Sequence, residues 1–308
     1  MIATGPRALI DALTSTIVGQ GEVVESLLLA LIADGHVLLE GPPGLAKTLA
    51  CRALAAALEG RFKRVQFTPD LLPADIIGTR VFDQREAVFN TVLGPIFANI
   101  VLADEINRAP AKVQSALLEG MQERQVTIGP QSHRLPDPFV VMATMNPIDA
   151  EGTYALPLAQ MDRFLMKVLV RYPSPNEELV ILERFGGEPR DLVADVATLD
   201  EVIGWRHAAR AVHVEPALAR YAVALTGATR APHDYLERGA SPRATLALVA
   251  LARARAFVAG RDFVLPDDLK ALAPAVLRHR VAFNYRTVTD GVDAEAIVRS
   301  LIAGVAAP

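Results

Sequence analysis

In the first half of the chain, short apolar runs alternate with longer segments whose apolar residues recur every three or four positions. The longer segments, of which Thr48–Leu58 and Lys112–Gln122 are examples, are predicted to be helices. The short runs predict five buried strands, at His36–Glu40, Val65–Phe67, Asn99–Ala103, Phe139–Ala143 and Met166–Val170. This order is typical of a mostly parallel α/β sheet, which binds ligands at the carboxyl ends of its strands.

Two segments interrupt the alternation. Between Gln125 and Leu135, two short strand-like runs flank Gly129-Pro130-Gln131, which predicts a β-hairpin ahead of the strand at Phe139. The segment from Thr68 to Pro95 is too long for an ordinary connection and is broken by prolines and glycines. We therefore expect a small inserted element there.

The second half of the chain has no convincing strand pattern. Arg171–Asn176 contains two prolines, which forbid a continuous helix or strand and predict a domain boundary. Beyond it, helical spacing recurs at Pro175–Phe185, Thr198–Val212, Glu215–Thr229, Pro242–Ala259 and Pro266–Leu277. We predict an αβα core over residues 1–172 and a small all-α domain over residues 173–308.

Composition narrows the class of protein. With 308 residues, 51% of them hydrophobic and 21% charged, the chain is globular and long enough for a core and a smaller companion. It has no apolar run of about 18 residues, so we expect no membrane span. A start without a secretory pattern and a single cysteine favour a cytoplasmic protein. A net charge of −4 argues weakly against broad nucleic-acid binding.

The stretch from Gly41 to Thr48 follows an apolar strand and opens a helix, which is the context of a phosphate-binding loop. Backbone N–H groups would surround the phosphates of ATP, with Lys47 on the β/γ oxygens and the Thr48 hydroxyl on Mg²⁺. The alternative is a Gly/Pro turn that precedes Lys-Thr by chance. The predicted nucleotide-binding residues of this stretch are Gly41, Pro42, Pro43, Gly44, Leu45, Ala46, Lys47, Thr48 and Leu49.

One position of this loop departs from the usual pattern. Glycine normally stands just before the lysine, and here Ala46 takes its place. A methyl group is tolerable at this position if φ stays negative, so we interpret Ala46 as a variant of the loop.

Two further apolar strands end in polar residues. One runs into Asp104 and Glu105, whose side chains would point in different directions, so that Asp104 faces Mg²⁺ and Glu105 the attacking water. The next leads to Asn146, which could orient the water or contact the γ-phosphate. Taken alone, acids after an apolar strand are common, and Asn146 is equally typical of a turn before Pro147.

Together these motifs resemble the AAA+ superfamily, and within it the MoxR family of the helix-2-insert group. The matching stretches follow the family's order over most of the chain: Ile17–Gln20, Gly41–Thr48, Phe67–Pro73, Gly94–Asn99, Ala103–Pro110, Gln114–Glu119, Asn146-Pro147, Glu151–Tyr154, Asp162–Phe164 and Gly239–Arg243. The resemblance implies an AAA+ P-loop αβα core with a parallel five-stranded sheet, followed by a small all-α lid domain.

The resemblance also implies roles for single residues. Asn146 is similar to sensor 1, Arg163 to the arginine finger that reaches the γ-phosphate bound by a neighbouring subunit, and Arg243 to sensor 2 on the lid. Gly19 and Gln20 would lie near the adenine. The insertion at residues 68–95 would hold the helix-2 insert, and the hairpin at residues 125–135 would be the one that precedes sensor 1.

Both arginines have an alternative interpretation. Arg163 could form a surface pair with the adjacent Asp162, and Arg243 could be a first-turn helix residue that faces water. The family usually has Pro-Glu-Ala-Gln before the finger, whereas this chain has Leu158 in place of the Glu. The strength of assembly and the placement of the finger therefore stay open.

Other side chains carry weaker signals. The six histidines are scattered without the spacing of a zinc site, so Mg²⁺ is the only metal that we expect. Cys51, four residues after Lys47, is predicted to be a packed thiol rather than a nucleophile. Arg253, Arg255 and Arg261 could meet a client or a phosphate, but a solvated face is the default interpretation. Arg278 and Arg280 have the same two interpretations.

The leading hypothesis is a ring-forming ATPase, a hexamer because Arg163 would act only in trans, that remodels, matures or activates a client protein complex. The family implies a separate partner with a von Willebrand factor A domain. A DNA-acting motor is the second hypothesis, although the hairpin has no interleaved aromatic residues. The third is a nucleotide-gated scaffold with little turnover, against which Glu105 argues.

Overall fold

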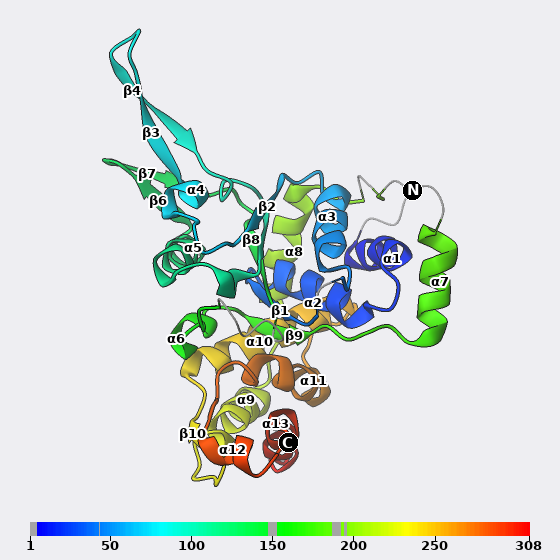
Figure 1. Ribbon diagram of the computed structural model, residues 1–308. Helices are drawn as coiled ribbons and strands as arrows, with labels where there is room; N and C mark the ends of the chain where they lie inside the picture. The colour runs from blue at the N-terminus through cyan, green and yellow to red at the C-terminus, as the bar shows by residue number, and fades with distance from the viewer. Residues whose placement is uncertain (1–4, 43, 147–152, 187–191, 194–195) are drawn as a thin grey trace. The chain divides into compact units, whose positions relative to one another are not determined.

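The computed structural model describes residues 5–42, 44–146, 153–186, 192–193 and 196–308 (Figure 1). The chain divides into two compact units. The first comprises Met1–Leu28, His36–Leu156 and Val168–Ile203, and the second comprises Leu29–Gly35, Pro157–Lys167 and Gly204–Pro308. Within the described ranges, no helix is both long enough and apolar enough to cross a membrane.

A five-stranded sheet with the order β2-β5-β8-β1-β9 is the centre of the first unit. Its strands are β1 (Val37–Glu40), β2 (Phe62–Gln66), β5 (Ile100–Asp104), β8 (Val140–Met145) and β9 (Met166–Leu169). The pairs β2–β5, β5–β8 and β1–β8 are parallel. β5 is buried at every position, as expected for a strand covered on both faces. The sheet predicted from the apolar runs is confirmed.

Strand β2 begins three residues earlier than predicted and ends at Gln66. It is an edge strand whose residues Lys63, Arg64 and Gln66 are exposed, so the apolar signal was confined to its end. Its register with β5 places Gln66 opposite Asp104. The polar side chains of β2 therefore lie beside the acidic end of β5.

The helices that lie wholly or partly in the first unit are α1 (Pro6–Thr16), α2 (Gly21–Ile32), α3 (Lys47–Ala57), α4 (Pro73–Ile77), the 3₁₀ turn Ile106–Arg108, α5 (Ala111–Glu123), α7 (Pro175–Phe185) and α8 (Leu199–Ala211). α3 packs against β5, and α1 packs against α3. The helices predicted around residues 48–58 and 112–122 are confirmed as α3 and α5. The apolar spacing did not predict α1 and α2.

Both interruptions of the alternation are hairpins of the first unit. The predicted hairpin is formed by β6 (Gln125–Ile128) and β7 (Gln131–Arg134). The inserted element consists of α4 and a second hairpin, β3 (Gly78–Asp83) with β4 (Val88–Leu93), which extends away from the sheet in Figure 1. The guanidinium of Arg80 stacks on the Phe89 ring at 4.8 Å, and its side chain leaves no room for a Cβ at Gly129 in the β6–β7 turn. The two hairpins therefore contact each other.

The second unit is mainly helical. Its helices are α6 (Leu158–Met161), α9 (Pro216–Ala228), α10 (Pro242–Val258), α11 (Pro266–Leu277), α12 (Tyr285–Thr289) and α13 (Ala294–Ala303). α10 begins at a proline behind Ser241, whose hydroxyl accepts a hydrogen bond from the Arg243 N–H. The expectation that this half contains no strand is wrong, because β10 (Leu236–Arg238) pairs with β11 (Ala282–Phe283). Such short strands leave no periodic signal.

The last passage of the chain from the first compact unit to the second follows residue 203, and the domain boundary after residue 172 stays a prediction. The segment between residues 172 and 203 is joined to the rest of the first unit by backbone and side-chain hydrogen bonds. Gln20 Nε2 donates to the Arg171 carbonyl at 2.9 Å, and Arg184 donates to the Ser15 carbonyl at 2.9 Å. The N–H groups of residues 196 and 197 both donate to the Ala57 carbonyl. The two prolines end β9 without separating α7 from the first unit.

Arg280 is the buried centre of a polar cluster in the second unit, so the default interpretation that it lies on a solvated face is wrong. Its side chain is 2% exposed, and Nε donates to Asp162 Oδ1 at 2.8 Å. The remaining guanidinium donors reach the carbonyls of Phe164, Leu165 and Val276. Burial lowers the pKa of Arg280 to about 10, against the opposing effect of Asp162.

Candidate functional site

The loop between β1 and α3 is shaped by two glycines. A Cβ on Gly41 would lie 2.5 Å from the Val170 carbonyl oxygen, so no side chain fits there. Gly44 has a φ of 83°, which glycine adopts without a steric penalty. After Gly44 the loop runs directly into the first turn of α3 at Lys47. The free N–H groups of that first turn then face the space in front of the loop.

Ala46 caps α3 with a φ of 56° and a ψ of 15°. The expectation of a negative φ is therefore wrong, because the alanine adopts the left-handed conformation that a glycine would take. For a residue with a Cβ this conformation costs roughly 1–2 kcal/mol. The loop retains its shape in spite of this local strain.

We expect Ala46→Gly to raise the free energy of unfolding by about 1 kcal/mol, because glycine adopts this φ without strain. Denaturant unfolding of the full chain measures the change. Ala56→Gly, in the right-handed part of α3, is the matched control and should lower the free energy of unfolding by about 0.5–1 kcal/mol. Equal destabilisation by both substitutions would show that Ala46 is unstrained.

Lys47 is held inside the loop. Its Nζ donates to the Gly41 carbonyl at 2.6 Å. Burial lowers the pKa of Lys47, and the nearby carboxylates of Asp104, Glu105 and Glu40 oppose that shift. The loop thus holds the ammonium in place, and the ammonium faces the acids at the end of β5.

The two acids at the end of β5 have different surroundings. Asp104 Oδ1 accepts a hydrogen bond from the Thr144 hydroxyl at 2.6 Å, and Oδ2 accepts bonds from Arg64 at 2.6 and 3.0 Å. Glu105 has a φ of 57°, and its Oε2 accepts from Gln66 at 2.9 Å and from Arg108 at 2.9 Å. Asp104 is thus held by Thr144 and Arg64, and Glu105 by Gln66 and Arg108.

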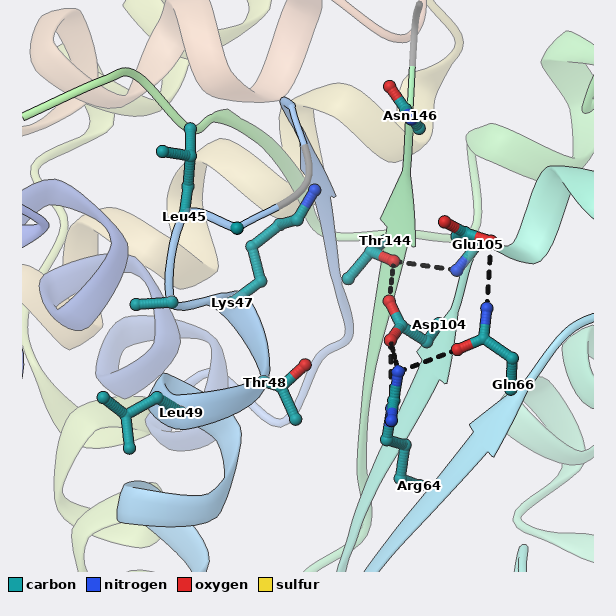
Figure 2. Close-up of a pocket in the computed structure, with 12 residues that line it drawn as sticks. Leu45, Lys47, Thr48, Leu49, Arg64, Gln66, Asp104, Glu105, Thr144 and Asn146 are labelled. Atoms are coloured by element: carbon teal, nitrogen blue, oxygen red, sulfur yellow. Dashed lines mark hydrogen bonds and ion pairs between the residues drawn. The ribbon is translucent and has the colours of Figure 1, made fainter. Parts of the chain in front are cut away.

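A cavity of about 410 Å³ joins the loop to these acids (Figure 2). Lys47 and Thr48 face Asp104 and Glu105 across it, with Asn146 at the end of β8. The lining residues are Gly44, Leu45, Ala46, Lys47, Thr48, Leu49, Arg64, Gln66, Asp104, Glu105, Thr144 and Asn146. A volume of this size is within the usual range for small-molecule sites.

The oxygen ligands and the ammonium of this cavity are suited to a phosphate ligand with Mg²⁺. The described residues contain no cluster of three or more His, Cys, Asp or Glu side chains that could cage a metal alone. Mg²⁺ prefers oxygen ligands and is usually held by one or two carboxylates together with substrate phosphates. The Thr48 hydroxyl and the Asp104 carboxylate are oxygen ligands of that kind, and both line the cavity beside Lys47.

Some predicted site residues lie elsewhere. Gly41, Pro42, Gly19 and Gln20 do not line the cavity, and Pro43 lies outside the described residues. Gly19, with a φ of 74°, and Gln20 pack instead on the segment that follows β9. The predicted motifs at residues 147 and 151–152 also lie outside the described residues. Cys51 is fully buried, and burial raises the pKa of its thiol, which confirms it as a packed side chain.

Arg163 and Arg243 belong to the second unit. Among its described residues, Asp162 pairs with Arg280 at 2.8 Å and with Arg243 at 3.7 Å, rather than with Arg163. The surface-pair interpretation of Arg163 is therefore wrong. Arg163 Nε is buried and has no hydrogen-bond partner in the described part of the chain. The Arg243 side chain is half exposed in the first turn of α10.

Sequence reasoning missed four residues that hold the acids. Arg64 and Gln66 come from β2, Thr144 from β8 and Arg108 from the turn after Glu105. The alternation of β2 gives a partial signal, because Arg64 and Gln66 are two residues apart and share a face. Only the pairing of β2 with β5 shows that this face meets the acids.

Comparison with known proteins identifies the family. A family model described as "ATPase family associated with various cellular activities (AAA)" matches residues 36–166, and a model of the AAA lid domain matches residues 228–301. Chaperone MoxR1 of Mycobacterium tuberculosis is 49% identical over 300 residues, which cover 95% of this chain and 79% of the relative. Protein MoxR of Methylorubrum extorquens is 35% identical over 294 residues, which cover 87% and 85% of the two chains. The chain belongs to the MoxR family of AAA+ ATPases.

A solved structure agrees with this assignment. The crystal structure of a candidate ATPase from Cytophaga hutchinsonii superposes with a TM-score of 0.91 at 41% identity and covers 98% of this chain and 94% of its own. The predicted AAA+ core and lid of a MoxR-family protein are confirmed. The AAA match includes the loop, the acids and Asn146, and the lid match lies in the second unit.

Proposed function

We propose that this MoxR-family protein binds ATP with Mg²⁺ in the cavity between the β1–α3 loop and strands β2, β5 and β8, and hydrolyses it. The observation that supports this proposal is the position of Lys47 and Thr48 opposite Asp104 and Glu105 in one cavity. The N–H groups at the start of a helix bind phosphates, and a carboxylate at the far wall is suited to activate water.

Each group of this cavity has a proposed role. The backbone N–H groups of residues 44–48 and the Lys47 ammonium bind the phosphates, while Thr48 and Asp104 supply oxygen ligands to Mg²⁺. The metal, when bound, neutralises charge on the β- and γ-phosphates. Glu105 accepts a proton from the attacking water as it approaches the γ-phosphorus, and Asn146 orients that water.

We propose that Arg163 completes the site in trans and that Arg243 acts as sensor 2. The support is the family's motif order together with the buried Nε of Arg163, which has no hydrogen-bond partner among the described residues. A guanidinium beside the γ-phosphate stabilises the charge of the transition state. A finger supplied by the next subunit requires a head-to-tail interface between subunits, and a closed hexameric ring is the proposed form.

The proposed cellular role is the remodelling, maturation or activation of a client protein complex in the cytoplasm. One relative is named a chaperone, which supports this role. A separate protein with a von Willebrand factor A domain is the proposed partner, on the basis of the family resemblance. The exposed β3–β4 hairpin and the neighbouring β6–β7 hairpin are the proposed moving contacts with the client.

Steady-state ATP hydrolysis by the full chain tests the proposal. We expect turnover per subunit to rise with protein concentration, in step with assembly measured by sizing in ATP, because Arg163 acts on a neighbour. Negligible turnover at every concentration, with ATP still bound, would favour a scaffold over an ATPase. Turnover stimulated by DNA would favour the motor hypothesis.

Mixing two inactive variants tests whether Arg163 acts on the cavity of a neighbouring subunit. Arg163→Ala retains an intact cavity, and Lys47→Ala retains an intact finger. A mixture of the two should recover activity that neither variant has alone, because a Lys47→Ala subunit supplies its finger to an Arg163→Ala neighbour. A mixture as inactive as its components, although the variants assemble together, would contradict a finger in trans.

A further inference from the structure

Arg64 is a second cation of the cavity and is not explained by the roles above. It lies on the edge strand β2, and its guanidinium donates twice to Asp104 Oδ2, at 2.6 Å from Nη2 and 3.0 Å from Nε. The same Nη2 donates to Gln66 Oε1 at 2.8 Å. Figure 2 shows this guanidinium directly against the carboxylate that the proposed function assigns to Mg²⁺.

Both oxygens of Asp104 are engaged by protein groups. Oδ1 accepts from the Thr144 hydroxyl, which is itself fixed because its oxygen accepts from the Glu105 N–H at 2.8 Å. Oδ2 is the oxygen that Arg64 contacts. Thr144 is a neutral group, so its bond leaves the charge of Asp104 uncompensated, whereas Arg64 supplies a full positive charge. A metal cation at Asp104 must therefore compete with Arg64.

A purely structural role for Arg64 is a poor explanation of this contact. The Arg64 side chain is 49% exposed, and an ion pair in such a position contributes little to stability. β2 and β5 are already joined by a ladder of five paired positions. The ion pair therefore acts mainly on the charge and orientation of Asp104.

We propose that Arg64 is a positioning residue that competes with Mg²⁺ for Asp104 and so sets the Mg²⁺ concentration at which the protein binds ATP. This inference rests on the proposed function. Arg64 holds the carboxylate in place before the metal arrives, and it leaves Oδ2 when Mg²⁺ and ATP occupy the cavity. Arg64 thereby raises the Mg²⁺ concentration that ATP binding needs, compared with a cavity that lacks this arginine.

The test is binding of a fluorescent ATP analogue to the full chain while Mg²⁺ is titrated from a chelated start. Arg64→Ala should lower the Mg²⁺ concentration for half-maximal binding about 3- to 10-fold, because Asp104 loses its competing cation. Arg64→Lys, which retains the charge but loses the two-pronged contact, should give an intermediate shift. The thermal midpoint of each variant should stay near that of the wild type.

Lys63→Ala is the matched control, because it removes one positive charge from the opposite face of the same strand. It should leave the Mg²⁺ midpoint unchanged. In an Asp104→Asn background, Arg64→Ala should also have no effect on the midpoint, since the two residues act through one contact.

The outcomes separate this inference from the proposed function. If the wild type binds the analogue but Arg64→Ala leaves the Mg²⁺ midpoint unchanged or raises it, the inference is overturned and the proposed site stands. Weaker binding by Arg64→Ala in the absence of Mg²⁺ would assign Arg64 to the phosphates and would equally overturn it. No binding by the wild type, with or without Mg²⁺, would overturn the proposed function and this inference with it.

Discussion

Glu105→Gln is expected to lower the rate of ATP hydrolysis about 100-fold or more while ATP binding persists. Glutamine has nearly the same shape as glutamate, but it cannot accept the proton of the attacking water. The side chain lies in the cavity at the end of β5, and its backbone N–H is fixed by the Thr144 hydroxyl. The substitution therefore removes the base without disturbing the phosphate-binding loop, so the loss should appear in kcat rather than in affinity.

Steady-state hydrolysis and equilibrium binding of ATP, measured on the same preparation, check this prediction. Glu123→Gln is the control, since Glu123 is an exposed glutamate at the end of α5 and does not line the cavity. It should retain the wild-type rate. Hydrolysis by Glu105→Gln at more than half of the wild-type rate would show that another group activates the water.

Arg280→Ala is expected to lower the free energy of unfolding by about 3–5 kcal/mol, which would be the largest stability effect of any substitution proposed. The change leaves the Asp162 carboxylate, 14% exposed, without its closest cation. It also removes the donors to the carbonyls of Phe164, Leu165 and Val276. Buried acceptors that lose their donors retain the full cost of leaving water.

Chemical denaturation followed by circular dichroism measures the effect. Arg286→Ala on α12 is the control, because Arg286 is exposed and its removal should change the free energy of unfolding by no more than about 0.5 kcal/mol. Arg280→Lys retains the charge but not the fork of donors, and it should fall between the two. A loss below about 1 kcal/mol in Arg280→Ala would mean that water or a rearranged side chain satisfies Asp162.

The sheet and the polar residues at the carboxyl ends of its strands could be predicted, because burial on both faces demands continuous apolar runs. Such runs are visible without knowledge of the fold, and so are the polar residues that follow them, such as Asp104 and Asn146. The glycines and Lys47 of the phosphate-binding loop are equally visible, since the loop is formed by consecutive residues. These local features were sufficient to predict the cavity's two principal walls.

The partners of the acids could not be predicted in the same way. Arg64 and Gln66 are polar residues on an edge strand, and such residues usually face solvent. Their contacts with Asp104 and Glu105 depend on the register of β2 against β5, about 40 residues along the chain. The left-handed backbone of Ala46 was also missed, because the loop as a whole imposes that conformation on a residue that does not favour it.

The sequence by itself determined the family, the strands of the central sheet, and the residues proposed to bind phosphate or activate water, because each depends on neighbours along the chain or on apolar periodicity. The tertiary structure alone decided which charges are buried and what holds them. Arg280 and Asp162 are 118 residues apart in sequence, and neither has a local signal that sets it apart from a surface residue. An ion pair of this kind forms only when packing brings two distant segments together and excludes water from both. No sequence pattern within one segment can therefore predict it.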